Sequence, residues 1–279
     1  MTSLPILTAS QMKACDGYTI DTLGIPSHIL MERAARRAAL FLNSRPDLFP
    51  AGKILLLCGS GNNSGDGFAM ARFLTDGSCG HPREVTVVYT GHLTEDGTPD
   101  VTRMSPECAR QYALAREEWI TILPVGGWKE AVRDAVVLVD AVFGIGLDRP
   151  VEGEISSLLA EAAATGLPVL AVDIPSGVNA DTGEVMGVAL PATATVTMQD
   201  YIPELYENDG GAVPPYDAHT TLPGNVGRAL KAPTITLVRS DEWALESKAD
   251  GPVPRLYVSW KYNDASTQAR VEYRRVDSE

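Results

Sequence analysis

The sequence has no excess of positive charge. Its 279 residues include 23 Lys and Arg against 36 Asp and Glu, which gives a formal net charge of −13 at pH 7. Binding to nucleic-acid phosphates or to an anionic membrane needs clustered Lys and Arg side chains. The charge balance therefore argues against nucleic acid and against a membrane surface as partners.

Long hydrophobic runs are also missing. Nowhere do about 18 consecutive apolar residues occur, the length that a membrane-spanning helix needs. The N-terminal sequence MTSLPILTAS lacks the basic segment and apolar core of a secretion signal. We therefore expect a cytoplasmic protein that does not interact with a membrane.

Cysteines are few and show no metal-binding spacing. Cys15, Cys58, Cys79 and Cys108 form no C-x-x-C pair, and no histidine stands at zinc-ligand spacing from them. Cys58 lies inside an apolar run, so we expect it to be a small buried hydrophobe. These features agree with a reducing compartment.

The most informative stretch is Lys53 to Leu74, KILLLCGSGNNSGDGFAMARFL. The apolar run Ile54 to Cys58 predicts a strand, and the apolar spacing that begins at Phe68 predicts a helix after a glycine-rich loop. This order of elements aims backbone N–H groups and a helix N-terminus at an anion. Spacing alone is a weak signal, because Ser64 stands where the dinucleotide fingerprint has its third glycine.

Two adjacent asparagines distinguish this loop. Asn62 and Asn63 offer side-chain carbonyl oxygens beside backbone N–H donors, which suits a hard cation as well as a phosphate. A second interpretation is that both only tolerate left-handed turn geometry and that Asp66 caps the helix. The sequence leaves both interpretations open.

Strands alternate with helices through most of the chain. Helices are predicted at about 8–23, 27–45, 68–75, 101–116, 128–133 and 153–165, and strands at 54–58, 84–89, 119–123, 135–140, 168–173 and 192–198. This alternation specifies an α/β fold whose mostly parallel sheet is covered by helices on both faces.

Polar residues gather where the predicted strands end. Asp140 ends VVLVD and Asp173 ends VLAVD, and ligands of parallel sheets bind beyond such strand ends. An aspartate there can bind a cation, hold a ribose hydroxyl or transfer a proton, or it can merely cap a turn. Ser176 is either a turn hydroxyl or a neutral oxygen ligand. Gly144 allows close backbone approach, and Arg149 could pair with a phosphate or stay solvated. Loops 59–67, 141–150 and 174–183 should therefore share one rim.

The pattern changes from Gln199 onwards. Residues 199–222 carry acids, glycines and prolines without apolar periodicity, which is typical of a linker. A strand is predicted at 235–238, and an antiparallel hairpin at 256–262 and 270–276. We therefore expect one domain over residues 1–198 and a divergent tail over residues 199–279.

From Leu7 to Met198 the chain resembles the NAD(P)H-hydrate epimerase family, also called the YjeF N-terminal domain. The matching stretches are LTASQMKACDGYTIDTLGIPSHILMERAA, CGSGNNSGDGFAMAR, VDAVFGIGLDRPVEG and AVDIPSGVNADTGEV. The resemblance implies a Rossmann-like three-layer α/β/α sandwich, usually a homodimer. It also implies an enzyme that interconverts the R and S forms of hydrated NADH and NADPH.

The resemblance assigns roles to individual residues. It implies a potassium ion (K+) held by Asn63, Asp140 and Ser176. It implies substrate contacts at Asn62, Asn63, Ser64, Gly65, Asp66, Gly144, Ile145, Gly146, Leu147, Asp148, Arg149, Pro150 and Asp173. A carboxylate that moves the proton of the substrate hydroxyl would lower the barrier to inversion, and Asp173 is the first candidate and Asp140 the second.

Two other functions are compatible with the fold. A non-catalytic nucleotide-binding or dimerisation module would not need the full set of ion-binding and catalytic candidates. An ordinary dehydrogenase would carry an acidic residue about 20 residues after the glycine loop, where Tyr89 and Thr90 stand. The sequence therefore favours the epimerase, and it leaves the choice between NADH and NADPH open.

Overall fold

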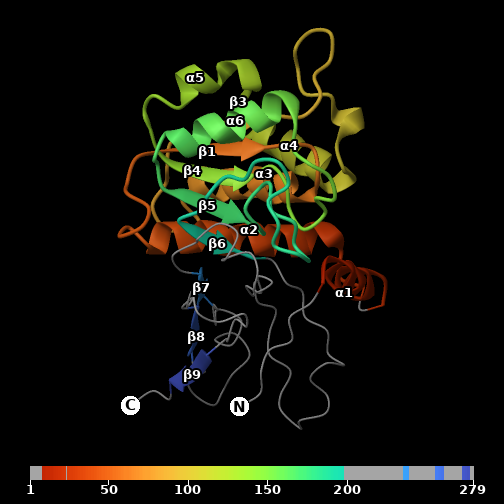
Figure 1. Ribbon diagram of the computed structural model, residues 1–279, viewed down its shortest axis with the longest axis vertical. Coiled ribbons are helices and arrows are strands. Elements are labelled where there is room, and N and C mark those ends of the chain that lie inside the picture. The colour runs from red at the N-terminus through yellow and green to blue at the C-terminus, as the bar shows by residue number, and fades with distance from the viewer. Residues whose placement is uncertain (1–7, 23, 198–234, 239–254, 261–271, 277–279) are drawn as a thin grey trace.

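The computed structural model describes residues 8–22, 24–197, 235–238, 255–260 and 272–276. Its main body is a six-stranded, all-parallel sheet in the order β3-β2-β1-β4-β5-β6 (Figure 1). The strands are β1 (Lys53–Cys58), β2 (Val85–Tyr89), β3 (Thr121–Pro124), β4 (Ala135–Ala141), β5 (Val169–Val172) and β6 (Ala194–Val196). The predicted α/β fold with a parallel sheet is confirmed.

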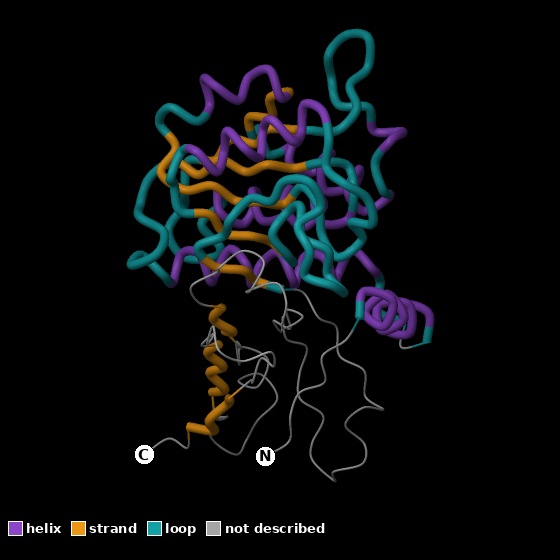
Figure 2. Tube along the Cα trace, in the orientation of Figure 1, coloured by secondary structure: helices purple, strands orange, loops and turns teal. Residues whose placement is uncertain are grey.

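Helices cover both faces of this sheet (Figure 2). On one face lie α2 (Ser27–Ser44), α3 (Asn62–Thr75) and α4 (Pro106–Glu117), and on the other lie α5 (Trp128–Ala131) and α6 (Gly153–Ala164). The first helix, α1 (Ala9–Asp21), lies away from the sheet (Figure 1). Two short 3-10 helices are η1 (Val101–Arg103) and η2 (Val125–Gly127).

The sequence of β1 explains why the sheet is buried on both sides. Ile54 and Leu56 belong to the core under α2, α3 and α4, whereas Leu55 and Leu57 belong to the core under α5 and α6. Successive strand residues point to opposite faces, so a strand covered on both faces needs a continuous apolar run. All four side chains are fully buried, and each burial stabilises the fold by about 1.5–3 kcal/mol.

The helix after the glycine loop begins earlier than predicted. It starts at Asn62 rather than near Phe68, because the N–H groups of Ser64 and Gly65 already bond to the carbonyl of Gly61. Asn62 and Asn63 therefore have no positive φ, and Gly61 rather than Asp66 is the N-cap. The interpretation of these residues as left-handed turn and cap is wrong.

The predicted helix at 101–116 is divided into two elements. After η1 the chain is extended at Met104, and α4 begins at Pro106. Proline has no N–H to donate, so it fits the first turn of a helix and not its interior. Ser105 is the N-cap, and its side chain accepts a hydrogen bond from the N–H of Cys108 at 3.3 Å.

Beyond the main sheet the structure describes three more strands. They are β7 (Ile235–Val238), β8 (Arg255–Trp260) and β9 (Glu272–Val276), which form an antiparallel sheet in the order β7-β8-β9. The β8–β9 pair coincides with the segments predicted as a hairpin. The linker predicted at 199–222 lies outside the described residues, and the domain boundary at Met198 stays a prediction.

All four cysteines are buried, and none forms a disulfide. Cys58 ends β1 and is fully buried, as expected for a small hydrophobe. Burial raises the pKa of the Cys58 thiol well above its usual value and that of Cys108 to about 12. In the part of the chain that the structure describes, no helix has the length and apolarity to cross a membrane.

Candidate functional site

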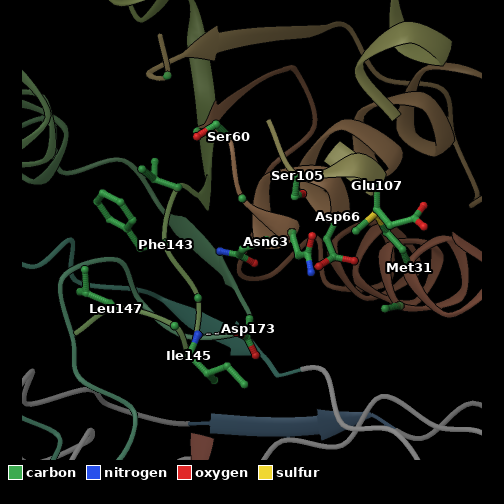
Figure 3. Close-up of a pocket in the computed structure, with 18 of the residues that line it drawn as sticks. Met31, Ser60, Asn63, Asp66, Ser105, Glu107, Phe143, Ile145, Leu147 and Asp173 are labelled. Carbon is green, nitrogen blue, oxygen red and sulfur yellow. Dashed lines mark hydrogen bonds between the residues drawn. The ribbon is translucent and has the colours of Figure 1, made fainter. Parts of the chain in front are cut away.

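A cavity of about 1590 Å³ opens at the C-terminal ends of β1, β2, β4 and β5. Its wall includes residues 59–63, 90–92 and 142–152, together with Asp173 and parts of α1, α2 and α4. Figure 3 shows Asn63, Ile145 and Asp173 on one side, with Asp66, Glu107 and Met31 on the other. The loops after β1 and β4 therefore meet at one rim, as the sequence predicts.

Asp173 adopts an unusual backbone conformation directly after β5. Its φ is +70°, a left-handed value that is uncommon for any residue except glycine. Its N–H donates to the carbonyl of Val196 and its own carbonyl accepts from the hydroxyl of Thr197, both at 2.7 Å. Such conformations cost about 1–3 kcal/mol and cluster at functional sites.

The carboxylate of Asp173 lies against the loop that follows β4. Its Oδ2 accepts a hydrogen bond from the N–H of Ile145 at 2.8 Å (Figure 3). A Cβ on Gly144 would lie 2.4 Å from this oxygen and 3.2 Å from the Cβ of Asn63. Only glycine at position 144 therefore lets the Asp173 carboxylate and Asn63 lie this close to the loop.

Asp140 and Ser176 form a buried pair behind the cavity wall. The hydroxyl of Ser176 donates to Asp140 Oδ1 at 2.6 Å, and its N–H donates to Oδ2 at 2.7 Å. The same hydroxyl accepts from the N–H of Phe143 at 2.8 Å, so the pair also fixes the start of the loop after β4. Burial raises the pKa of Asp140 to about 6, although the hydrogen bonds from Ser176 and Val142 act in the opposite direction.

Asn63, the third residue of the predicted ion site, lies in the first turn of α3. Its side chain is only 8% exposed, and both Oδ1 and Nδ2 are buried without a hydrogen-bond partner. Leaving a buried polar group unsatisfied costs about 1–3 kcal/mol. Because Asn63 also lines the cavity, a bound ligand or ion is the natural partner for its amide.

Two of the predicted substrate contacts do not line the cavity. The Ser64 hydroxyl accepts from the N–H of Gly59 at 2.6 Å and donates to the carbonyl of Ala141 at 2.8 Å, so it links the ends of β1 and β4. Gly65 faces α2, where an added Cβ would lie 2.7 Å from the sulfur of Met31. Because this segment is helical, with about 3.6 residues per turn, Asn62, Asn63 and Asp66 face the cavity while Ser64 and Gly65 face inward.

The remaining predicted substrate contacts do line the cavity. They are Asn62, Asn63, Asp66, Gly144, Ile145, Gly146, Leu147, Asp148, Arg149, Pro150 and Asp173. Asp140 is fully buried and lies outside the lining, behind the cavity wall, so its carboxylate is less well placed than that of Asp173 to touch a substrate.

Several lining residues were not predicted from the sequence. From α1 and α2 they include Met12, Lys13, Arg33, Arg36 and Arg37, and from other elements Thr90, His92, Ser105 and Glu107. The Thr90 hydroxyl and Glu107 Oε2 are buried without a hydrogen-bond partner. Thr90 could have been identified from the sequence, because it stands where many dinucleotide-binding chains carry an acidic residue that binds the ribose.

Comparisons with known proteins agree with this architecture. The chain is 40% identical over 194 residues to the NAD(P)H-hydrate epimerase of Limosilactobacillus fermentum, which covers 68% of this chain and 84% of that protein. It is 38% identical over 191 residues to the NAD(P)H-hydrate epimerase of Weissella koreensis, which covers 68% and 79%. The crystal structure of yeast ynu0 shares the fold, with a TM-score of 0.62 and 16% identity over 98% of this chain and 100% of that one.

A family match covers every site residue that the sequence predicts. Residues 27–203 match the family described as YjeF-related protein N-terminus, and this range includes the glycine loop, Asp140, Asp173 and Ser176. Together with the identity to the curated relatives, this match shows that the chain belongs to the YjeF-related protein N-terminus family.

Proposed function

We propose that this protein is an NAD(P)H-hydrate epimerase that interconverts the R and S forms of hydrated NADH and NADPH. The identity to relatives of that name, over 84% and 79% of their length, supports this function. Within the site, the observation that carries the proposal is the Asp173 carboxylate, fixed by Ile145 on the wall of a cavity that can hold a dinucleotide. From the family resemblance we further propose a homodimer, and we propose that it is cytoplasmic.

The chemistry requires a proton to move at one defined place. In the hydrated cofactor the hydroxyl is on a ring carbon bonded to nitrogen. The nitrogen lone pair can expel this hydroxyl as water once the hydroxyl has gained a proton; alternatively, loss of the hydroxyl proton forms a carbonyl, breaks the C–N bond and opens the ring, with a proton passing to nitrogen. Addition from the other face then inverts the centre. Asp173 would transfer the proton in either route: its carboxylic acid would protonate the departing hydroxyl, or its carboxylate would take the hydroxyl proton and then return it, and the bond from Ile145 fixes its orientation.

The pyrophosphate of the substrate would lie at the N-terminus of α3. Gly61 caps this helix without a side-chain hydrogen bond, and Asn62 and Asn63, its first two residues, line the cavity. A helix N-terminus presents backbone N–H groups and a positive dipole end, both of which favour an anion.

We propose a potassium ion beside Asp140. The buried Asp140 carboxylate, the Ser176 hydroxyl and the unpartnered amide oxygen of Asn63 are oxygen groups of the kind that hard cations prefer. These three residues would hold the ion, which would neutralise Asp140 and add positive charge near the pyrophosphate. Among the described residues no group of three His, Cys, Asp or Glu could hold a metal ion, so the proposed site rests on mixed oxygen ligands.

The test is to mix the purified protein with the R hydrate of NADH or NADPH and to follow the S form by chromatography. We expect the two forms to equilibrate faster than they do without protein. If the protein binds the hydrates but leaves the spontaneous rate unchanged, it is a non-catalytic binding module of the same fold.

A further inference from the structure

We propose that the hollow at the C-terminal end of β2, lined by Thr90, Gly91 and His92, receives the adenosine ribose and accepts the 2′-phosphate of the NADPH hydrate. Thr90 is then the residue that determines specificity between the two hydrates. The inference rests on the proposed function, because it assumes that the substrate is a hydrated nicotinamide dinucleotide.

The strand order places the two halves of the substrate. In sheets of the order β3-β2-β1-β4-β5-β6 a dinucleotide crosses the carboxyl ends of the strands, with its pyrophosphate at the helix after β1. The reacting ring must lie near Asp173, which follows β5. The adenosine half therefore extends to the other side of β1, where β2 ends and where Thr90, Gly91 and His92 line the cavity.

Thr90 is held firmly in this wall. Its N–H donates to the carbonyl of Cys58 at 2.7 Å, and its Oγ1 lies 3.5 Å from the position that a Cβ of Gly59 would take. The residue is 7% exposed, and its hydroxyl is buried without a hydrogen-bond partner. A ribose or phosphate oxygen of the substrate would give this hydroxyl the partner that it lacks.

The side chain at the end of β2 carries no negative charge, which suits a phosphorylated ribose. A carboxylate at this position binds the 2′-hydroxyl of NADH, and it would repel a 2′-phosphate. Thr90 is neutral, and the Nε2 of His92 lies 3.2 Å from Nη2 of Arg103. Asp100, whose N–H donates to the carbonyl of His92 at 2.9 Å, accepts from the N–H and hydroxyl of Thr102 at 3.0 and 2.7 Å.

Other carboxylates of the cavity offer a competing place for the ribose. Asp66 on α3 and Glu107 on α4 both line the cavity, and Figure 3 labels both on the same side as Met31. Glu107 accepts a hydrogen bond from the Ser27 hydroxyl, and its other oxygen has no partner. Glu107 could bind ribose hydroxyls, so the test must separate this position from Thr90.

The test compares Thr90→Asp with Thr90→Asn in the full chain, because asparagine is neutral and has the shape of aspartate. The quantity measured is kcat/KM for the NADPH hydrate divided by kcat/KM for the NADH hydrate. We expect Thr90→Asp to lower this ratio about tenfold or more, because the new carboxylate faces the 2′-phosphate. Thr90→Asn should keep the ratio within about twofold of that of the unmodified protein.

Two results would overturn the assignment. One is an unchanged ratio in a Thr90→Asp protein that melts at the same temperature as Thr90→Asn and still epimerises the NADH hydrate. The other is a ratio that responds to Glu107→Gln and not to Thr90→Asp, which would place the ribose at α4.

Failure of the proposed function would look different. The unmodified protein would then epimerise neither hydrate. In that case the specificity is measured as the Kd for NADPH divided by the Kd for NADH, in the unmodified protein and in the same variants. A Kd ratio that Thr90→Asp leaves unchanged would overturn the inference, and a ratio that shifts about tenfold toward NADH would support it.

Discussion

The hydroxyl of Thr197 donates a 2.7 Å hydrogen bond to the backbone carbonyl of Asp173. The N–H of Asp173 is bonded to Val196, so the end of β6 holds both backbone groups of a residue whose φ is +70°. Thr197 is only 6% exposed, which leaves water little access to replace its hydroxyl. Thr197 is thus a positioning residue that keeps the Asp173 carboxylate turned toward Ile145.

Removing this hydroxyl should slow catalysis more than it weakens binding. Thr197→Val keeps the shape of the side chain, and we expect kcat to fall about tenfold while KM changes less, because the carboxylate loses its fixed position. Thr197→Ser restores the donor and should restore most of kcat. A valine variant with normal kcat would show that the backbone of Asp173 holds its conformation without Thr197.

Replacing the proposed proton-transfer group should abolish most activity in a folded protein. Asp173→Asn can still accept the hydrogen bond from Ile145 but cannot take up a proton, so the rate should fall about 10²-fold or more. Asp148→Asn, which changes an exposed carboxylate of the same cavity, should cost much less. A normal rate in Asp173→Asn together with an inactive Asp140→Asn would transfer the catalytic role to Asp140.

A single methyl group at position 144 should displace the Asp173 carboxylate. In Gly144→Ala the new Cβ would lie 2.4 Å from Asp173 Oδ2, so one of the two must move. We expect a loss of activity of about 10²-fold and a destabilisation of about 1–3 kcal/mol. Gly126→Ala is the control, since a Cβ there meets nothing within 4 Å, and it should change neither activity nor thermal stability.

The buried charge of Asp140 should make stability depend on potassium. Its pKa is raised to about 6, above an unfolded value of about 3.9, so without a cation its stabilising contribution is present below about pH 4 and lost as pH rises through about 6. The loss amounts to about 3 kcal/mol, and a bound cation would offset it at neutral pH.

The measurement is thermal unfolding at pH 7.5 in potassium chloride and in choline chloride of equal ionic strength. We expect a higher Tm in potassium for the unmodified protein and no difference for Asp140→Asn. An equal Tm in both salts for the unmodified protein would argue against an ion at this site.

The domain boundary can be tested by truncation. A chain that ends at Met198 keeps every described element of the parallel sheet and every lining residue of the cavity. We expect it to fold and to bind the hydrated cofactor as the full chain does, measured by thermal unfolding and by ligand titration. Insolubility or lost binding would mean that residues 199–279 complete the sheet or the site.

The residues at the rim of the sheet were predictable because short stretches of the sequence identify them. Apolar strands that end in Asp140 and Asp173 define both the strand direction and the position of the carboxylates. The start of α3 was not predictable, because Gly65 and Gly67 resemble loop residues although they serve close packing against Met31, Ala141 and Cys58.

Contacts between distant segments were the other part that the sequence could not supply. Thr197 meets Asp173 only through the parallel register of β5 and β6, in which Val172 pairs with Val196. The contribution of α1 and α2 to the cavity likewise depends on how these helices pack. Neither arrangement leaves a periodic pattern or a short motif in the chain.

Because all four thiols are buried, the rate at which each is alkylated reports the rate at which the structure around it opens. The reactive species is the thiolate, and burial raises the pKa of the Cys58 and Cys108 thiols, so a maleimide can label these positions only as fast as the structure opens. Cys15 lies in α1, whereas Cys58 ends the central strand β1. Mass spectrometry of the labelled peptides would therefore time the detachment of α1 separately from the opening of the sheet.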